Sequence, residues 1–174
     1  MKKLLYLAIA YQLYLVTRAT GSGAESLLAA RAITDGLVPY RDFMLHVGPL
    51  PAYLLAGLMM VPVEAWASLV YIAFNLLSAW GLYKLARMRF DEEVALVVVI
   101  GFLVLLPLYG GNENFPEGML CTFGVWGMYC YEKKRKAWAL GLWVLGTLVK
   151  QTGVLFLMIP VLEGFYGMYK RRYR

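Results

Sequence analysis

Long apolar runs separated by short polar breaks constrain this chain more than any other feature. Six runs occupy residues 3–19, 65–83, 93–109, 115–131, 137–150 and 153–169. Because 61% of the residues are hydrophobic and 16% are charged, no stretch remains for a separate soluble domain. Each run roughly suits a helix that crosses a bilayer with some thinning or snorkelling. The sequence therefore predicts an all-α integral membrane protein, a bundle of about six transmembrane helices forming one module over residues 1–174.

The distribution of basic residues favours six spans, because lysine and arginine gather on the cytoplasmic side. Six spans place 13 of the 17 basic residues on that side: Lys2, Lys3, Lys84, Arg87, Arg89, Lys133, Lys134, Arg135, Lys136, Lys170, Arg171, Arg172 and Arg174. The apolar segment 49–63 is short and contains three prolines, so we expect it to lie in the interface or to dip in and return. A seventh span there would invert the charge bias. We predict a multi-pass integral membrane protein with both termini cytoplasmic, in the plasma membrane if the protein is prokaryotic.

Composition also excludes several function classes. The formal charge of +6 comes from basic clusters that flank apolar runs, which argues for the lipid bilayer and against nucleic acid as a partner. Cys121 and Cys130 fall within one apolar run, so neither a structural disulfide nor a zinc site is expected. Three tryptophans near the ends of the predicted spans are interpreted as interfacial anchors: Trp66, Trp138 and Trp143.

The first external loop, residues 20–64, is unusually polar for such a chain. Ser22 followed by Glu25 has the spacing of a capping box, and Gly36 suits the end of a helix that starts there. Alanines along this helix allow close packing, so one or two juxtamembrane helices are expected on the outer face. Pro39 then precedes a turn in which Arg41 lies beside Asp42.

Several segments together resemble one family. They are DGLVPYRDF (35–43), HVGPLPAYLLAG (46–57), LYKLARMRFDEEVALVVVIGFLVLLPLY (82–109), NENFPEGMLCTFGVW (112–126) and WALGLWVLGTLVKQTGVLFLMIPVL (138–162). In order and spacing they are similar to the N-terminal conserved module of GT-C superfamily membrane glycosyltransferases. The resemblance implies transfer of a sugar from a polyprenyl-phosphate donor at the external face, with the lipid-linked sugar as a partner.

Two departures from the family pattern leave an alternative open. Members usually carry an Asp, often Asp-Glu, after the first span, whereas this chain has Ala24-Glu25. Full-size members also continue through further spans beyond the point where this sequence stops. The alternative is a non-catalytic membrane subunit or lipid-binding module that keeps the GT-C scaffold and works with a partner chain.

The chemistry of sugar transfer from a phosphate needs a carboxylate as general base on the acceptor hydroxyl. Glu25 and Asp42 are the candidate catalytic residues. The structural alternatives are the capping box for Glu25 and a turn pair with Arg41 for Asp42.

The departing phosphate needs cations and hydrogen-bond donors. The candidate substrate-binding residues are Arg31, Tyr40, Arg41, His46, Lys150 and Gln151. His46 could also act in proton transfer. Glu113 and Glu117, four residues apart, could share a divalent cation, Mg²⁺ or Mn²⁺, with Glu25 or Asp42; the alternative is an ordinary loop and helix start.

Overall fold

A computed structural model describes residues 1–18, 24–58, 64–106 and 116–172, and over these ranges the helices are joined by loops and turns. The expectation of an all-α fold is therefore confirmed. One isolated bridge joins Pro39 and Phe43. The helices are α1 (Lys2–Arg18), α2 (Ala24–Thr34), α3 (Pro49–Leu58), α4 (Glu64–Ala86), α5 (Glu92–Leu105), α6 (Glu117–Glu132), α7 (Lys136–Val149), the short 3₁₀ helix η2 (Gln151–Gly153) and α8 (Val154–Arg172).

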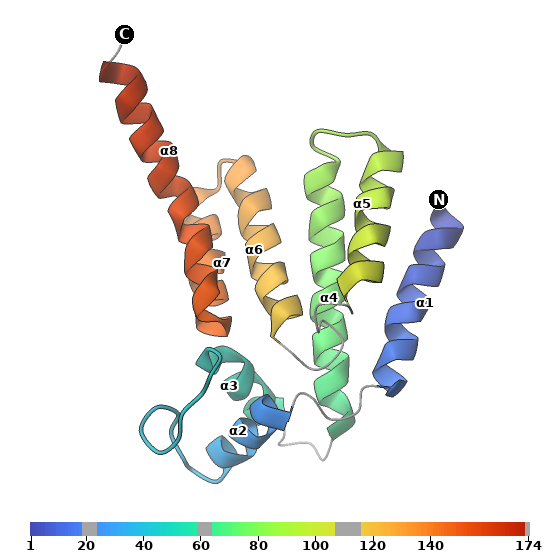
Figure 1. The fold of residues 1–174 in the computed structure, drawn as a ribbon, viewed down its shortest axis with the longest axis vertical. Coiled ribbons are helices and arrows are strands. Elements are labelled where there is room, and N and C mark those ends of the chain that lie inside the picture. The colour runs from blue at the N-terminus through green and yellow to red at the C-terminus, as the bar shows by residue number, and fades with distance from the viewer. Residues whose placement is uncertain (19–23, 59–63, 107–115, 173–174) are drawn as a thin grey trace.

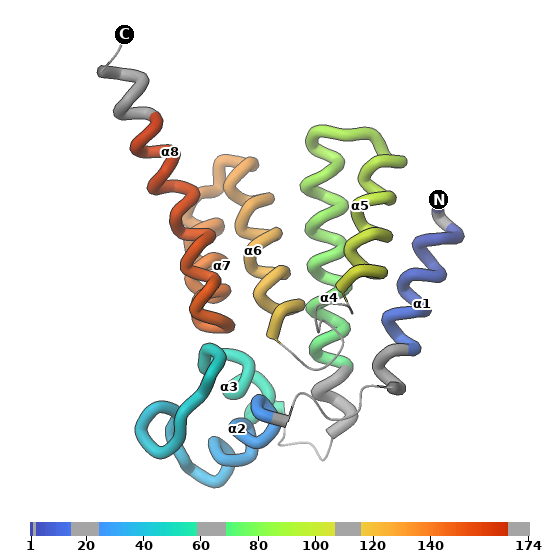
Figure 2. Tube along the Cα trace, viewed as in Figure 1, coloured from blue at the N-terminus to red at the C-terminus, as the bar shows by residue number. Residues whose placement is uncertain are grey.

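Six of the helices run alongside one another as a bundle, and α2 and α3 lie together at one end of it (Figure 1). Within the bundle α6 packs between α4 and α7, and α5 packs between α1 and α4. The trace leaves α1 for α2 and returns to the bundle through α4 (Figure 2). We call residues 24–58, which comprise α2, the intervening loop and α3, the lobe. The lobe contacts the bundle where α3 meets α7.

The prediction of six transmembrane helices is wrong for the described residues. Only one helix is long and apolar enough to cross a membrane, over Leu69–Ala86 in α4. The predicted span at 137–150 forms α7, and the described part of the span at 93–109 forms α5; each of these helices has 14 residues. At 1.5 Å per residue such a helix is roughly 21 Å long, shorter than a hydrocarbon core of about 30 Å. The predicted runs lie within four residues of the observed helices at each end, so the error was to accept apolar runs of this length as membrane spans.

The multi-pass localisation is corrected for the same reason. One helix that meets the length and composition test is weak support for membrane insertion, since the core helix of a soluble protein meets it too. The segment 49–63 contains α3, a ten-residue helix. It is too short to span, as predicted, and it packs on α2; residues 59–63 lie outside the described part.

The sequence of α2 explains both its end and its packing. Gly36 adopts a φ of +87°. Its N–H donates to the Ile33 carbonyl at 3.0 Å, and the Leu37 N–H donates to the Ala32 carbonyl at 2.9 Å. This pair of bonds is a Schellman ending, for which glycine is favoured because the left-handed conformation costs it little. The predicted helix end at Gly36 is therefore confirmed.

Small residues allow close helix packing in both the lobe and the bundle. Ala30 of α2 is fully buried with Leu55 and Tyr71, which come from α3 and α4. In the bundle, Trp143 is fully buried and its indole lies against Gly127 of α6. The interpretation of Trp143 as an interfacial anchor is therefore wrong.

Candidate functional site

An exposed carboxylate and the single histidine meet in the lobe. Glu25 Oε1 accepts a hydrogen bond from the His46 backbone N–H at 2.9 Å and lies 3.2 Å from His46 Nδ1. The two side chains are 47% and 90% exposed. Because a carboxylate only accepts, the contact is favourable when Nδ1 carries a proton. In neutral histidine this arrangement leaves Nε2 as a solvent-facing proton acceptor.

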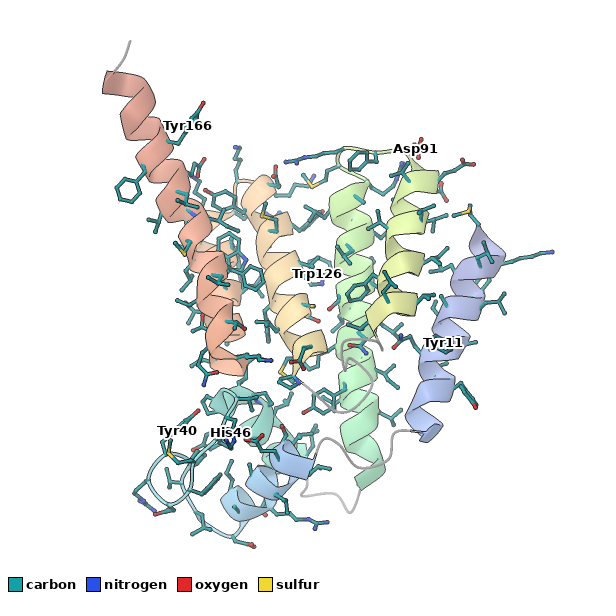
Figure 3. All side chains as sticks on the ribbon, in the orientation of Figure 1. Tyr11, Tyr40, His46, Asp91, Trp126 and Tyr166 are labelled. Carbon is teal, nitrogen blue, oxygen red and sulfur yellow. The ribbon has the colours of Figure 1, made fainter. Side chains whose placement is uncertain are left out.

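The loop that carries His46 is fixed at several points. Leu45 is buried between α2 and α3 with Ala29 and Ala52. Gly48 donates its N–H to the Val149 carbonyl at the end of α7, at 2.9 Å. Tyr40 Oη donates to the Val47 carbonyl at 3.0 Å, so the loop folds back on itself (Figure 3). The position of His46 therefore depends on how the lobe docks on α7.

Arg41 and Asp42 form a separate, self-contained pair. The Arg41 guanidinium donates from Nε and Nη2 to the two carboxylate oxygens at 2.9 and 2.8 Å. Asp42 Oδ2 also accepts the Val38 N–H at 2.8 Å. The hydrogen bonds from Arg41 and from Val38 hold the pKa of the Asp42 carboxyl below its ordinary value. A carboxylate so held is a weak proton acceptor, so the geometry favours Glu25 over Asp42 as the basic group.

A third pair joins the start of α6 to the end of α7. Lys150 Nζ lies 2.5 Å from Glu117 Oε1, and the two side chains are 34% and 27% exposed. The other carboxylate oxygen of Glu117, Oε2, is buried and has no hydrogen-bond partner within the described residues. The buried Tyr71 hydroxyl is hydrogen-bonded to Ser26 of α2 and lies within electrostatic reach of Glu117. Helices α2, α4 and α6 and the end of α7 thus supply one polar cluster.

The other predicted binding residues are spread over the lobe and the end of the bundle. Arg31 is exposed in the last turn of α2. Tyr40 is half exposed and has a φ of +64°, a backbone conformation that is unusual for a non-glycine residue. Gln151 is exposed in η2, next to Lys150. The structure thus groups Tyr40, Arg41 and His46 on one loop and leaves Lys150 with Gln151 at the end of α7.

The divalent-cation site stays a prediction. Glu113 lies outside the described residues, as does Ser22 of the predicted capping box. Glu117 uses one carboxylate oxygen for Lys150. In the ranges that the structure describes, no three histidine, cysteine, aspartate or glutamate side chains gather closely enough to hold a metal ion. Cys121 and Cys130 are both free and partly exposed.

Sequence reasoning missed three residues that shape this region. Ser26 and Tyr71 fall in apolar helical segments, where the sequence alone does not show which hydroxyl groups meet once the helices pack. The third residue is Gly48, and its position between His46 and Pro49 was a sequence signal that could have identified it. A glycine between two fixed residues indicates close approach of another backbone.

Comparisons with protein-family models, with curated proteins and with solved structures found no match to the chain. The resemblance to the GT-C superfamily therefore stays a prediction that depends on the sequence segments alone.

Proposed function

We propose that the chain transfers a sugar from a polyprenyl-phosphate donor to a hydroxyl acceptor, with the Glu25 and His46 pair as the proton-accepting group. The observation that carries this proposal is the contact of Glu25 Oε1 with both the backbone N–H and Nδ1 of His46. A carboxylate that orients an imidazole in this way leaves its other nitrogen ready to accept a proton.

The proposed reaction is a single displacement at the sugar's anomeric carbon. His46 Nε2 takes the proton of the acceptor hydroxyl while the hydroxyl oxygen forms the new glycosidic bond. The bond from the anomeric carbon to the phosphate oxygen breaks, and its electron pair leaves with the polyprenyl phosphate. Negative charge on the phosphate grows during this step, so a nearby guanidinium stabilises it.

Arg41 is the cation best placed for that role. It lies on the same fixed loop as His46, and its side chain is 68% exposed although it is paired with Asp42. The pairing orients the guanidinium and leaves Nη1 outside the two hydrogen bonds to Asp42. A phosphate oxygen could therefore bind without breaking the pair.

The alternative function is a non-catalytic module that binds a lipid phosphate and works with a partner chain. One observation favours it. The two cations at the site are already neutralised, Arg41 by Asp42 and Lys150 by Glu117. A neutralised cation stabilises the charge that develops on a departing phosphate less than a free one does, which counts against catalysis more than against binding.

The test is transfer of a radiolabelled hexose from a short-chain polyprenyl-phosphate donor, measured with the purified chain and a panel of hydroxyl acceptors. We expect Glu25→Gln to lower the transfer rate by about 10²- to 10⁴-fold, the range for loss of a positioned acid or base. Glu93→Gln is the matched control, because Glu93 is exposed in the first turn of α5, far from the lobe. Equal rates in the two variants would overturn the role of Glu25. Saturable lipid binding without transfer would favour the non-catalytic alternative.

A further inference from the structure

Two apolar surfaces face solvent on opposite sides of the bundle. Helix α8 lies at one side and α1 at the other (Figure 1). Leu162 of α8 is 59% exposed, and Leu7 of α1 is 65% exposed. Exposed apolar surface of this kind marks an interaction site. The proposed sugar transfer uses neither surface, because its residues lie in the lobe.

The exposed side chains of α8 form one row. Its members recur at intervals of three and four residues, so they share one face of the helix. They are Val154, Leu155, Met158, Val161, Leu162 and Phe165, and all six are about half exposed. The opposite face meets the bundle, since Phe156 lies against Gly124 and Glu163 accepts a hydrogen bond from Tyr131. The α8 row is therefore directed away from the bundle.

The second surface is an apolar groove of about 310 Å³ between α1 and α5. Its lining residues are Leu4, Leu7, Ala8, Tyr11, Ile100 and Val104. Ile100 and Val104 share a face of α5 with Val97 and Glu93, because these four residues also recur at intervals of three and four. Val97 is 57% exposed. The α5 side of the groove thus continues as an apolar row up to an acidic first turn.

The α8 row and the groove match in length, direction and charge. The rows Val154–Phe165 and Glu93–Val104 each extend over about 17 Å at 1.5 Å per residue. Because α5 begins at the end of the bundle where α8 finishes (Figure 1), α8 of a second copy in the same orientation would run antiparallel to α5, which aligns the helix dipoles favourably. In sequence, residues 170–172 at the end of α8 are a lysine and two arginines, whereas α5 begins with Glu92 and Glu93.

We propose that α8 of one copy packs into the groove between α1 and α5 of a second copy, so that the chain associates head to tail. Such a contact is heterologous, because it joins two different surfaces and leaves one of each kind free on the pair. Among the described helices only α4 is long and apolar enough to cross a membrane, so burial in a bilayer does not account for the exposed rows of α1 and α8. The inference does not depend on the proposed sugar transfer.

The experiment measures the mass of the purified full chain in mild detergent by analytical ultracentrifugation over a range of concentrations. We expect the mass of the wild type to rise above that of one chain as the concentration increases. Leu162→Lys in the α8 row and Leu7→Lys in the groove should each weaken self-association by about 100-fold, because each removes a buried leucine and places a charge in the contact. Leu28→Lys is the matched control, since Leu28 is 62% exposed on α2 in the lobe, and it should associate as the wild type does.

An equimolar mixture of Leu162→Lys and Leu7→Lys tests the head-to-tail arrangement. Each variant keeps the surface that the other has lost, so the mixture should form a complex of two chains and grow no further. Met158→Lys and Leu4→Lys give the same test at a second position of each surface, and circular dichroism should show the helicity of the wild type in every variant.

Three results would overturn the inference. A wild type that remains a single chain at every concentration would indicate that lipid or detergent covers these surfaces. Self-association of Leu7→Lys alone would indicate that α8 packs on α8 of the second copy. Equal association of the wild type and all the variants would indicate non-specific adhesion of apolar surface.

Discussion

Docking of the lobe on α7 depends on Gly48, so Gly48→Ala is the most informative single change. A Cβ at this position would overlap the Leu148 carbonyl and would lie 2.9 Å from the Val149 carbonyl carbon. These are backbone atoms near the end of a helix, which cannot turn aside as a flexible side chain can. The Gly48 N–H also donates to the Val149 carbonyl at 2.9 Å, and the added methyl group would push this bond apart.

The magnitude follows from these two contacts. Overpacking of this kind costs about 1–3 kcal/mol, and the weakened hydrogen bond costs about 1 kcal/mol more. We expect the free energy of unfolding to fall by about 2–4 kcal/mol. For a chain of this size that corresponds to a drop in Tm of roughly 5–15 °C.

The assay is thermal unfolding followed by circular dichroism, with Gly57→Ala as the control. Gly57 lies in α3, and a Cβ there meets nothing within 4 Å. That substitution should be neutral or stabilise by up to about 1 kcal/mol, because alanine is the better helix former. If Gly48→Ala were as stable as Gly57→Ala, the close contact between lobe and α7 would be refuted.

Two further predictions concern the lobe loop and the bundle. The guanidinium and amide partners of Asp42 lower its pKa, so its contribution to stability is present above the ordinary aspartate pKa and is lost as pH falls through the lowered one. The chemical shift of the Val38 amide, which reports this contact, should therefore stay constant as the pH falls through the ordinary range of aspartate pKa values. A change of this shift within that range would contradict the prediction. So would the same pH titration of the shift in Asp42→Asn. In the bundle, a Cβ on Gly127 would lie 2.9 Å from Trp143 Cε2. Gly127→Ala should therefore lower the free energy of unfolding, measured by chemical denaturation, by about 1–3 kcal/mol. An unchanged denaturation midpoint would contradict this packing.

Local signals in the sequence predicted the lobe well. The end of α2 at Gly36 depends only on the conformational freedom of glycine and on bonds within six residues. The pair of Arg41 and Asp42 is likewise local, because the two residues are neighbours. Such features need no knowledge of the rest of the fold.

Features that depend on distant contacts could not be predicted. Glu25 and His46 are 21 residues apart, and Lys150 and Glu117 are 33 apart. Nothing in their spacing indicates that they meet. The helix positions were predicted within four residues at each end, but apolar composition did not reveal that helices such as α5 and α7 are too short to cross a membrane.

The central claim is that Glu25 and His46 act as one proton-accepting unit in sugar transfer. The most direct measurement is a double-mutant cycle on the transfer rate, using Glu25→Gln, His46→Gln and the double variant with the radiolabelled donor. If the two residues act as a unit, the double variant should be about as slow as the slower single variant, since the second substitution removes a function that is already lost. Effects that multiply in the double variant would show that the two residues act independently and would contradict the account.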